Sequence, residues 1–287
     1  MDSRNGQHFW RTRPVSKNNI PLSMNTEQFI KTMPLSSGCS VIKFDDCGLI
    51  AINKKAGRAT HPNNNSSRNA KPPMLRTRYN LRDEYYSWED ENGEKRRLYL
   101  INRLDSPTSG VVLGADNPEV ANLAKLAFKE KTVQKTYMAI CIGRVGCTDK
   151  WIDSLALRSK DGHLRSFTSK DGNVAITHCK FVKEDLNRAK LSLVELNPIT
   201  GLTHQLRVQC AKRKFPILGD ATYGDFAFNK RIRSASKINR LFLHCSKTEL
   251  TINHNGKDIH FVAEAPLPES FSSILDFNIK IAKIFRF

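Results

Sequence analysis

The chain has 287 residues, of which 39% are hydrophobic, and it carries 46 Lys and Arg against 28 Asp and Glu, a formal net charge of +18. It is long enough to bury the core of one large domain or two smaller ones, and the lack of a long apolar run or a signal-peptide core predicts a soluble, cytoplasmic protein without a membrane span. Seven scattered cysteines without a Cys-x-x-Cys pair, and eight histidines without ligand spacing, favour free thiols and argue against a disulfide framework or a metal site.

Two segments in the N-terminal third have an unusual composition. Residues 1–38 are weakly basic and rich in Asn, Ser and Pro, which predicts a basic, irregular or partly ordered arm ahead of a single domain at residues 39–287. Within that domain, residues 63–97 are polar and dense in charges of both signs, with three tyrosines and a tryptophan interleaved. We interpret residues 63–97 as an insertion.

The next segment places a carboxylate on a constrained loop. Residues 98–101 and 111–113 predict short strands, and the sequence Ser-Pro-Thr-Ser-Gly at 106–110 consists of turn formers that cannot continue a ladder. Asp105 therefore lies on a loop at strand ends, where catalytic groups tend to be found. The alternative is a local turn in which Arg103 and Asp105 form a salt bridge.

Helical and strand patterns follow this loop. Asn117 and Pro118 predict a helix start, with an apolar face at residues 120, 123, 124 and 127. Thr203 predicts the cap of a second helix, which places Arg207 near that helix's start. Strands are predicted at residues 134–142, 175–182, 191–196, 241–244 and 259–263. Because strands and helices do not alternate regularly, the pattern favours an α+β fold with an antiparallel or mixed sheet.

Several segments occur in an order that is typical of one enzyme family. Arg103-Leu104-Asp105 is followed by Thr108-Ser109-Gly110, and Thr203-His204-Gln205-Leu206-Arg207 comes later in the chain. With residues 49–57, 134–139, 215–224, 240–244 and 261–268, these motifs resemble the RluA-type family of RNA pseudouridine synthases over roughly residues 45–270. The resemblance implies a mixed, mostly antiparallel sheet split by a central cleft, with flanking helices. It also implies a cofactor-independent isomerase that converts uridine to pseudouridine in ribosomal or transfer RNA.

The resemblance further implies roles for particular side chains. Asp105 corresponds to the catalytic nucleophile, Arg207 to the cation that keeps it charged and oriented, and Tyr137 to the ring that stacks on the target uracil. Arg103 corresponds to the side chain that fills the place of the flipped uridine. The other expected RNA contacts are Lys54, Lys135, Thr203, His204 and Gln205. No metal or cofactor is implied, and we expect a monomer whose partner is RNA.

The distribution of charge supports a polyanionic partner independently of the resemblance. Residues 207–240 contain nine basic and two acidic side chains, and a basic stripe beside a catalytic loop is suited to phosphate contacts. The charged and aromatic residues 63–97 could touch RNA in the same way, or they could form a solvated peripheral hairpin.

Departures from the family pattern leave two alternatives open. Asn102 stands where His is usual, Leu202 where Arg is usual, and Gln209 where His often follows. The changes at 102 and 202 motivate a catalytically silent RNA-binding or ribosome-assembly factor on the same fold. The other alternative is a metal-dependent nuclease that uses Asp105 with Asp220, although the sequence shows no acidic cluster around them.

Overall fold

The computed structural model describes residues 24–62, 71–145, 149–160, 163–184 and 190–276. Its helices are α1 (Met24–Thr32), α2 (Pro118–Lys129), α3 (Gln205–Lys212), α4 (Phe226–Ser236) and α5 (Glu269–Leu275). Its strands are β1 (Ser40–Phe44), β2 (Leu49–Lys54), β3 (Arg78–Asn80), β4 (Tyr85–Glu89), β5 (Lys95–Leu100), β6 (Ser109–Ala115), β7 (Gln134–Ile142), β8 (Asp149–Lys160), β9 (His163–Thr168), β10 (Asn173–Glu184), β11 (Leu191–Pro198), β12 (Leu243–His254) and β13 (Lys257–Glu264).

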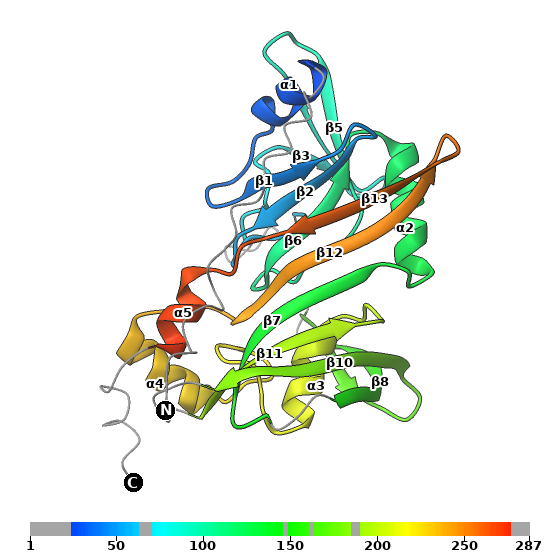
Figure 1. Ribbon diagram of the computed structural model, residues 1–287. Coiled ribbons are helices and arrows are strands. Elements are labelled where there is room, and N and C mark those ends of the chain that lie inside the picture. Colours follow the sequence, from blue (N-terminus) through cyan, green and yellow to red (C-terminus); the bar gives the residue numbers. More distant parts are fainter. Residues whose placement is uncertain (1–23, 63–70, 146–148, 161–162, 185–189, 277–287) are drawn as a thin grey trace, which may run out of the picture.

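These strands form one sheet that extends through the whole molecule (Figure 1). Its main path has the order β3-β4-β5-β6-β12-β7-β11-β10-β8-β9, and β1, β2 and β13 attach beside this path. Every strand pairing is antiparallel apart from the one between β6 and β12. The predicted α+β fold with a mixed, mostly antiparallel sheet is therefore confirmed.

The parallel contact between β6 and β12 lies directly after the loop that carries Asp105. Ser109 pairs with His244, and Gly110 pairs with Cys245. Gly110 has a φ of +112°, and a Cβ atom at this position would lie 2.1 Å from the carbonyl oxygen of Cys245. Only glycine allows the two backbones to approach this closely, so Gly110 fixes where the two strands meet.

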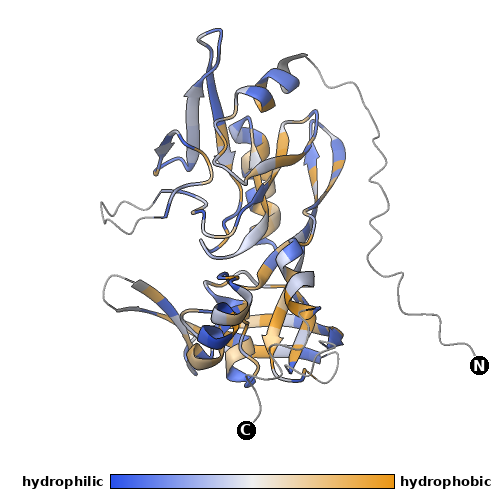
Figure 2. Ribbon diagram, turned by 90° about the vertical axis from the view of Figure 1, so that its left-hand side faces the viewer, coloured by the Kyte–Doolittle hydropathy of each residue, from blue (hydrophilic) through white to orange (hydrophobic). Residues whose placement is uncertain are grey.

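The core is divided among both faces of the sheet. On β7, Met138 and Ile140 belong to a hydrophobic cluster with residues of α4 and α5, whereas Ala139 and Cys141 pack in another cluster with residues of α3. Successive residues of β7 therefore pack on opposite faces of the sheet. Figure 2 shows hydrophobic strand segments inside the molecule and a hydrophilic hairpin, formed by β4 and β5, at its upper end.

The structure describes parts of the two N-terminal segments of unusual composition. The segment predicted as an irregular or partly ordered arm contains α1 from Met24 onward, which places the Phe29 ring against Trp88, with centroids 5.1 Å apart. Residues 1–23 lie outside the described residues. Residues 78–100 extend the sheet as β3, β4 and β5, and Tyr86 and Trp88 are buried. Those two rings therefore pack in the core and are not available to stack on RNA, while residues 63–70 lie outside the described residues.

The sequence favours free thiols, and the cysteines that the structure describes agree with this. The six cysteines among the described residues form no disulfide, and four of them are buried. In the same parts of the chain, no helix is both long and apolar enough to cross a membrane.

Candidate active site

The loop that carries Asp105 connects β5 to β6 and is anchored by side chains as well as by backbone. The hydroxyl of Thr60 donates to the carbonyl oxygen of Leu104 at 2.9 Å and accepts from the Leu104 N–H at 3.1 Å. The amide oxygen of Asn102 accepts from the N–H of Leu113 in β6 at 2.8 Å. Asn102 thus satisfies a backbone donor, and these anchors hold Asp105 in a defined place.

A buried ammonium group supports the same loop from behind. Lys54 Nζ donates to the carbonyl oxygens of Thr108 at 2.6 Å, Arg58 at 2.7 Å, Ser106 at 3.2 Å and Lys55 at 3.3 Å. Its side chain has no exposed surface, and burial lowers the pKa of Lys54 to about 7. The four acceptors connect the end of β2 to the catalytic loop.

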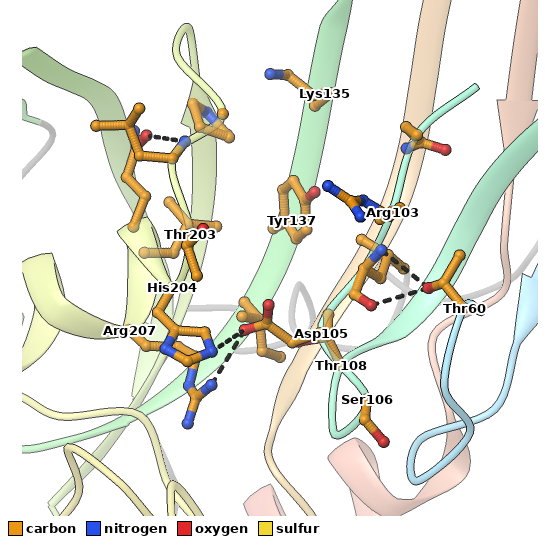
Figure 3. Close-up of a pocket in the computed structure, with 18 of the residues that line it drawn as sticks. Thr60, Arg103, Asp105, Ser106, Thr108, Lys135, Tyr137, Thr203, His204 and Arg207 are labelled. Carbon is orange, nitrogen blue, oxygen red and sulfur yellow. Dashed lines mark hydrogen bonds and ion pairs between the residues drawn. The ribbon is translucent and has the colours of Figure 1, made fainter. Parts of the chain in front are cut away.

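Arg207, in the first turn of α3, joins two carboxylates. Its Nη1 donates to Asp105 Oδ2 at 3.1 Å (Figure 3), while its Nε and Nη2 donate to the two carboxylate oxygens of Asp220 at 2.8 and 2.9 Å. The side chains of Arg207 and Asp220 are buried, whereas 26% of the Asp105 side chain is exposed. The bidentate contact with Asp220 fixes the plane of the guanidinium. The remaining nitrogen, Nη1, therefore points at Asp105.

The charges of this cluster depend on one another. Burial acts to lower the pKa of Arg207, but the hydrogen bonds and charge of Asp220, and then of Asp105, raise this pKa above its ordinary value. Burial acts to raise the pKa of Asp220, but the hydrogen bonds and charge of Arg207 prevail and lower the pKa of Asp220. Arg207 is therefore a permanent cation between two carboxylates at neutral pH.

His204 lies beside Asp105 in a strained backbone conformation. It precedes α3 with φ 55° and ψ 16°, the left-handed region that few non-glycine residues adopt. The Tyr223 hydroxyl accepts from the N–H of Ser166 at 2.9 Å and lies 2.9 Å from His204 Nδ1. Tyr223 can therefore donate its own proton to Nδ1, which leaves the protonated Nε2 facing Asp105 Oδ2 at 3.7 Å. Burial lowers the pKa of His204, so the ring is neutral at pH 7.

Asp105 faces a pocket of about 560 Å³. Tyr137 and Lys135, both on β7, line one wall, and Arg103 lines another with its side chain exposed (Figure 3). Tyr137 is half-buried, and burial raises the pKa of Tyr137 well above its usual range. Its ring therefore offers an uncharged aromatic surface next to the carboxylate.

Comparison with known proteins shows which family has this arrangement. A family model described as RNA pseudouridylate synthase matches residues 48–212, a range that includes Asp105, Tyr137 and Arg207. The chain belongs to the RNA pseudouridylate synthase family. The described part of this pseudouridine synthase contains no group of three or more His, Cys, Asp or Glu side chains able to hold a metal ion.

Individual relatives agree with the family model. The chain is 31% identical over 233 residues to the uncharacterized RNA pseudouridine synthase YhcT of Bacillus subtilis, with 81% of this chain and 70% of that protein covered. It is 31% identical over 259 residues to ribosomal large subunit pseudouridine synthase D of Borreliella burgdorferi, with 89% and 74% covered. Among solved structures, human RNA pseudouridylate synthase domain containing 1 superposes with a TM-score of 0.60 at 22% identity, covering 83% of this chain and 87% of that one. That structure shows a shared fold.

The pseudouridine synthase fold brings most of the predicted site residues to one pocket. Those that line it are Arg103, Asp105, Lys135, Tyr137, Thr203, His204, Gln205 and Arg207. Thr203 is not the cap of α3, because that helix begins at Gln205 and His204 takes the cap position without a side-chain hydrogen bond. The left-handed conformation at His204 shifts the predicted start.

Two of the residues expected to contact RNA have almost no exposed surface. Lys54 is completely buried and Gln205 is 4% exposed. The Gln205 amide accepts from Thr200 Oγ1 at 2.8 Å and donates to Thr177 Oγ1 at 3.0 Å. The polar groups of both residues are already satisfied inside the fold, which does not favour the predicted RNA contacts. Gln209, also fully buried, donates to the Asp153 carboxylate at 2.9 Å in the same way.

Sequence reasoning did not predict the roles that three residues have in this pseudouridine synthase site. Asp220 orients Arg207, Tyr223 orients His204, and Thr60 anchors the catalytic loop. The Pro- and Gly-punctuated segment at 215–224 carried a signal for the first two. No local feature of the sequence marks Thr60.

Proposed function

We propose that this protein isomerises uridine to pseudouridine in structured RNA, either ribosomal or transfer RNA. In this proposal Asp105 is the nucleophile, Arg207 is its cationic partner and Tyr137 stacks on the target base. The proposal is supported by family membership and by the name of the Borreliella relative, which refers to the large ribosomal subunit. The net charge of +18 favours a polyanionic substrate.

The observation that carries the proposal is the contact between Asp105 and Arg207. A carboxylate that is partly exposed to a pocket, and held at 3.1 Å by a guanidinium that is itself fixed by Asp220, is oriented for attack. The guanidinium also stabilises the carboxylate anion when an incoming nucleoside displaces water. The metal-dependent nuclease alternative loses support, because Arg207 separates the two carboxylates that would have to share a metal ion.

The reaction requires three steps from these residues. The bond between C1′ of the ribose and N1 of uracil breaks, the freed base turns, and C5 of uracil bonds to C1′ while the proton on C5 leaves and N1 takes up a proton. Asp105 serves as a nucleophile that also departs readily, whether it attacks the sugar, attacks the ring or assists a glycal route. Tyr137 keeps the detached base in the pocket while it turns, by stacking on its face.

The uridine has to leave its helix before this chemistry. Arg103, exposed at the pocket wall two residues before the nucleophile, takes the place of the extruded base and offsets part of the unstacking cost. Lys135 and His204 contact the nucleoside or its neighbours within the pocket. The reaction needs no cofactor, and the enzyme works as a monomer.

Mapping pseudouridine across total RNA tests this function. Cells that lack the gene are compared with the same cells that carry the wild-type gene or the Asp105→Ala variant. We expect marks that appear only with the wild type, while the purified variant retains RNA affinity. Identical maps in all three strains, with a growth defect that Asp105→Ala rescues, would instead indicate a silent RNA-binding or assembly factor.

A further inference from the structure

A second hollow of about 1670 Å³ lies on the other side of the catalytic loop. It shares Asp105, His204 and Arg207 with the first pocket, so the two cavities are continuous at the nucleophile. Beyond these three shared residues, none of the roles proposed above involves the side chains that line this hollow. The additional cationic side chains on its walls include Lys55, Arg165 and Arg240.

Arg240 differs from Arg207 because it is partly buried without a carboxylate partner. Its Nε donates to the carbonyl oxygen of Leu241 at 3.0 Å, Nη2 to Ser109 Oγ at 2.6 Å and Nη1 to Ser270 Oγ at 3.4 Å. The ring of Phe271 lies 5.2 Å from its guanidinium carbon. No ion pair joins Arg240 to an acidic side chain among the described residues, and burial lowers the pKa of Arg240 to about 10.

A directed chain of hydrogen bonds holds this guanidinium in place. His244 Nε2 lies 3.3 Å from the carbonyl oxygen of Ala265 and must be its donor, so His244 Nδ1 accepts from Ser109 Oγ at 2.8 Å. Ser109 Oγ in turn accepts from Arg240 Nη2. Ser109 is the first residue of β6, directly after the catalytic loop, and His244 is its partner across the parallel contact. The position of Arg240 is therefore coupled to the loop that presents Asp105.

A buried cation is normally paired, because an uncompensated charge away from water is costly. The polar contacts of Arg240 are to neutral oxygens, the longest of them from Nη1 to Ser270 Oγ at 3.4 Å, and Arg240 lines the hollow. An anion that enters the hollow would complete this site. Guanidinium groups match the geometry of phosphate oxygens particularly well.

We propose that Arg240 binds a backbone phosphate of the RNA strand next to the uridine that reaches Asp105. This proposal rests on RNA being the substrate. While the base occupies the pocket with Tyr137, the strand continues past Asp105 into the second hollow, where Arg240 neutralises one phosphodiester. The hydrogen-bond chain through Ser109 sets the distance between that phosphate and the nucleophile.

The salt dependence of RNA binding tests this proposal. Each variant is placed in the Asp105→Ala protein, and its affinity for a short, fluorescently labelled oligouridylate is measured over a range of salt concentrations. Loss of one phosphate contact reduces the slope of log affinity against log salt by about 0.7 for a single strand. We expect this reduction for Arg240→Gln, a retained slope for Arg240→Lys, and no change for the control Lys129→Gln, which removes an exposed charge outside both cavities.

One further variant, and a check that each protein is folded, keep the outcome decisive. Ser109→Ala removes the hydrogen bond but leaves the guanidinium charge, so we expect its slope to be retained. An unchanged slope for Arg240→Gln in a folded protein, or an equal reduction for Ser109→Ala, overturns the phosphate contact. Binding is measured without the nucleophile, so failure of the proposed isomerisation would appear separately, as wild-type protein that produces no pseudouridine.

Discussion

Replacing Lys54 with methionine tests whether the catalytic loop depends on a buried ammonium group. Lys54 Nζ has its shortest contacts with the carbonyl oxygens of Thr108 and Arg58, at 2.6 and 2.7 Å. Hydrogen bonds from a charged donor contribute about 1.5–3 kcal/mol each, so these two contribute about 3–6 kcal/mol. Methionine has a similar length and no donor, and it leaves these carbonyl oxygens without their partner.

Burying the charged ammonium of Lys54 costs a free energy similar in size to that of the two hydrogen bonds. It lowers the pKa of Lys54 from 10.5 to about 7, which corresponds to about 5 kcal/mol between the two protonation states. The unfolded chain holds the proton up to pH 10.5, whereas the folded chain loses it near pH 7. The unfolded state therefore binds more protons in this window, and the stability that depends on Lys54 rises with pH.

Urea denaturation at several pH values measures this effect. We expect the free energy of unfolding of wild type, relative to Lys54→Met, to increase by several kcal/mol as the pH rises from about 7 to about 10. Lys129→Met, which alters an exposed lysine, should show no such trend. A difference between wild type and Lys54→Met that stays constant or falls over this range would refute the reasoning. We also expect a lower kcat for Lys54→Met, because the loop that presents the nucleophile loses its anchor.

Three other changes test separate parts of the account. Gly110→Ala should lower the free energy of unfolding by more than about 3 kcal/mol, because its new Cβ meets a backbone carbonyl of β12. Gly57→Ala, at a φ of +84° with open space around it, should cost only about 1–2 kcal/mol; equal losses in urea denaturation would contradict the close approach of β6 and β12. Tyr137→Leu should reduce kcat/KM about 5- to 150-fold, the equivalent of about 1–3 kcal/mol of stacking, whereas Tyr137→Phe should keep most activity; a similar loss in both would argue against stacking. Burial lowers the pKa of His204, so protonation penalises the folded state, and wild type should lose stability relative to His204→Asn as the pH falls below about 6.5. A difference that does not depend on pH would show that the ring is not buried as described.

Local signals in the sequence were sufficient for the elements that depend on neighbouring residues. Asn117 and Pro118 predicted the start of α2, and the Asn117 side chain accepts from the N–H of Val120 at 2.9 Å. The alternating residues of β7 predicted its bounds, because each face packs against a different cluster. Strands β8 and β9 were not predicted, since exposed apolar residues such as Ile152 and Leu157 weaken their alternation.

The geometry of the site depends on contacts between distant segments, which local patterns do not record. Lys54 follows an apolar strand, and a lysine there predicts a surface charge. Its burial becomes favourable only when the catalytic loop supplies two of its four carbonyl acceptors. The position of Asp220 was visible in the sequence, but its role depends on α3 bringing Arg207 to it. The His204 ring is likewise held by a residue of another segment, because its Nδ1 lies 2.9 Å from the Tyr223 hydroxyl.

Release of tritium from RNA labelled at C5 of uridine tests the central claim most directly, because this hydrogen leaves only when C5 bonds to the ribose. Purified wild-type protein should release tritium from its substrate RNA, and Asp105→Asn should release none while it binds the same RNA with unchanged affinity. Release by Asp105→Asn at the wild-type rate would contradict the role of this carboxylate as the nucleophile held by Arg207.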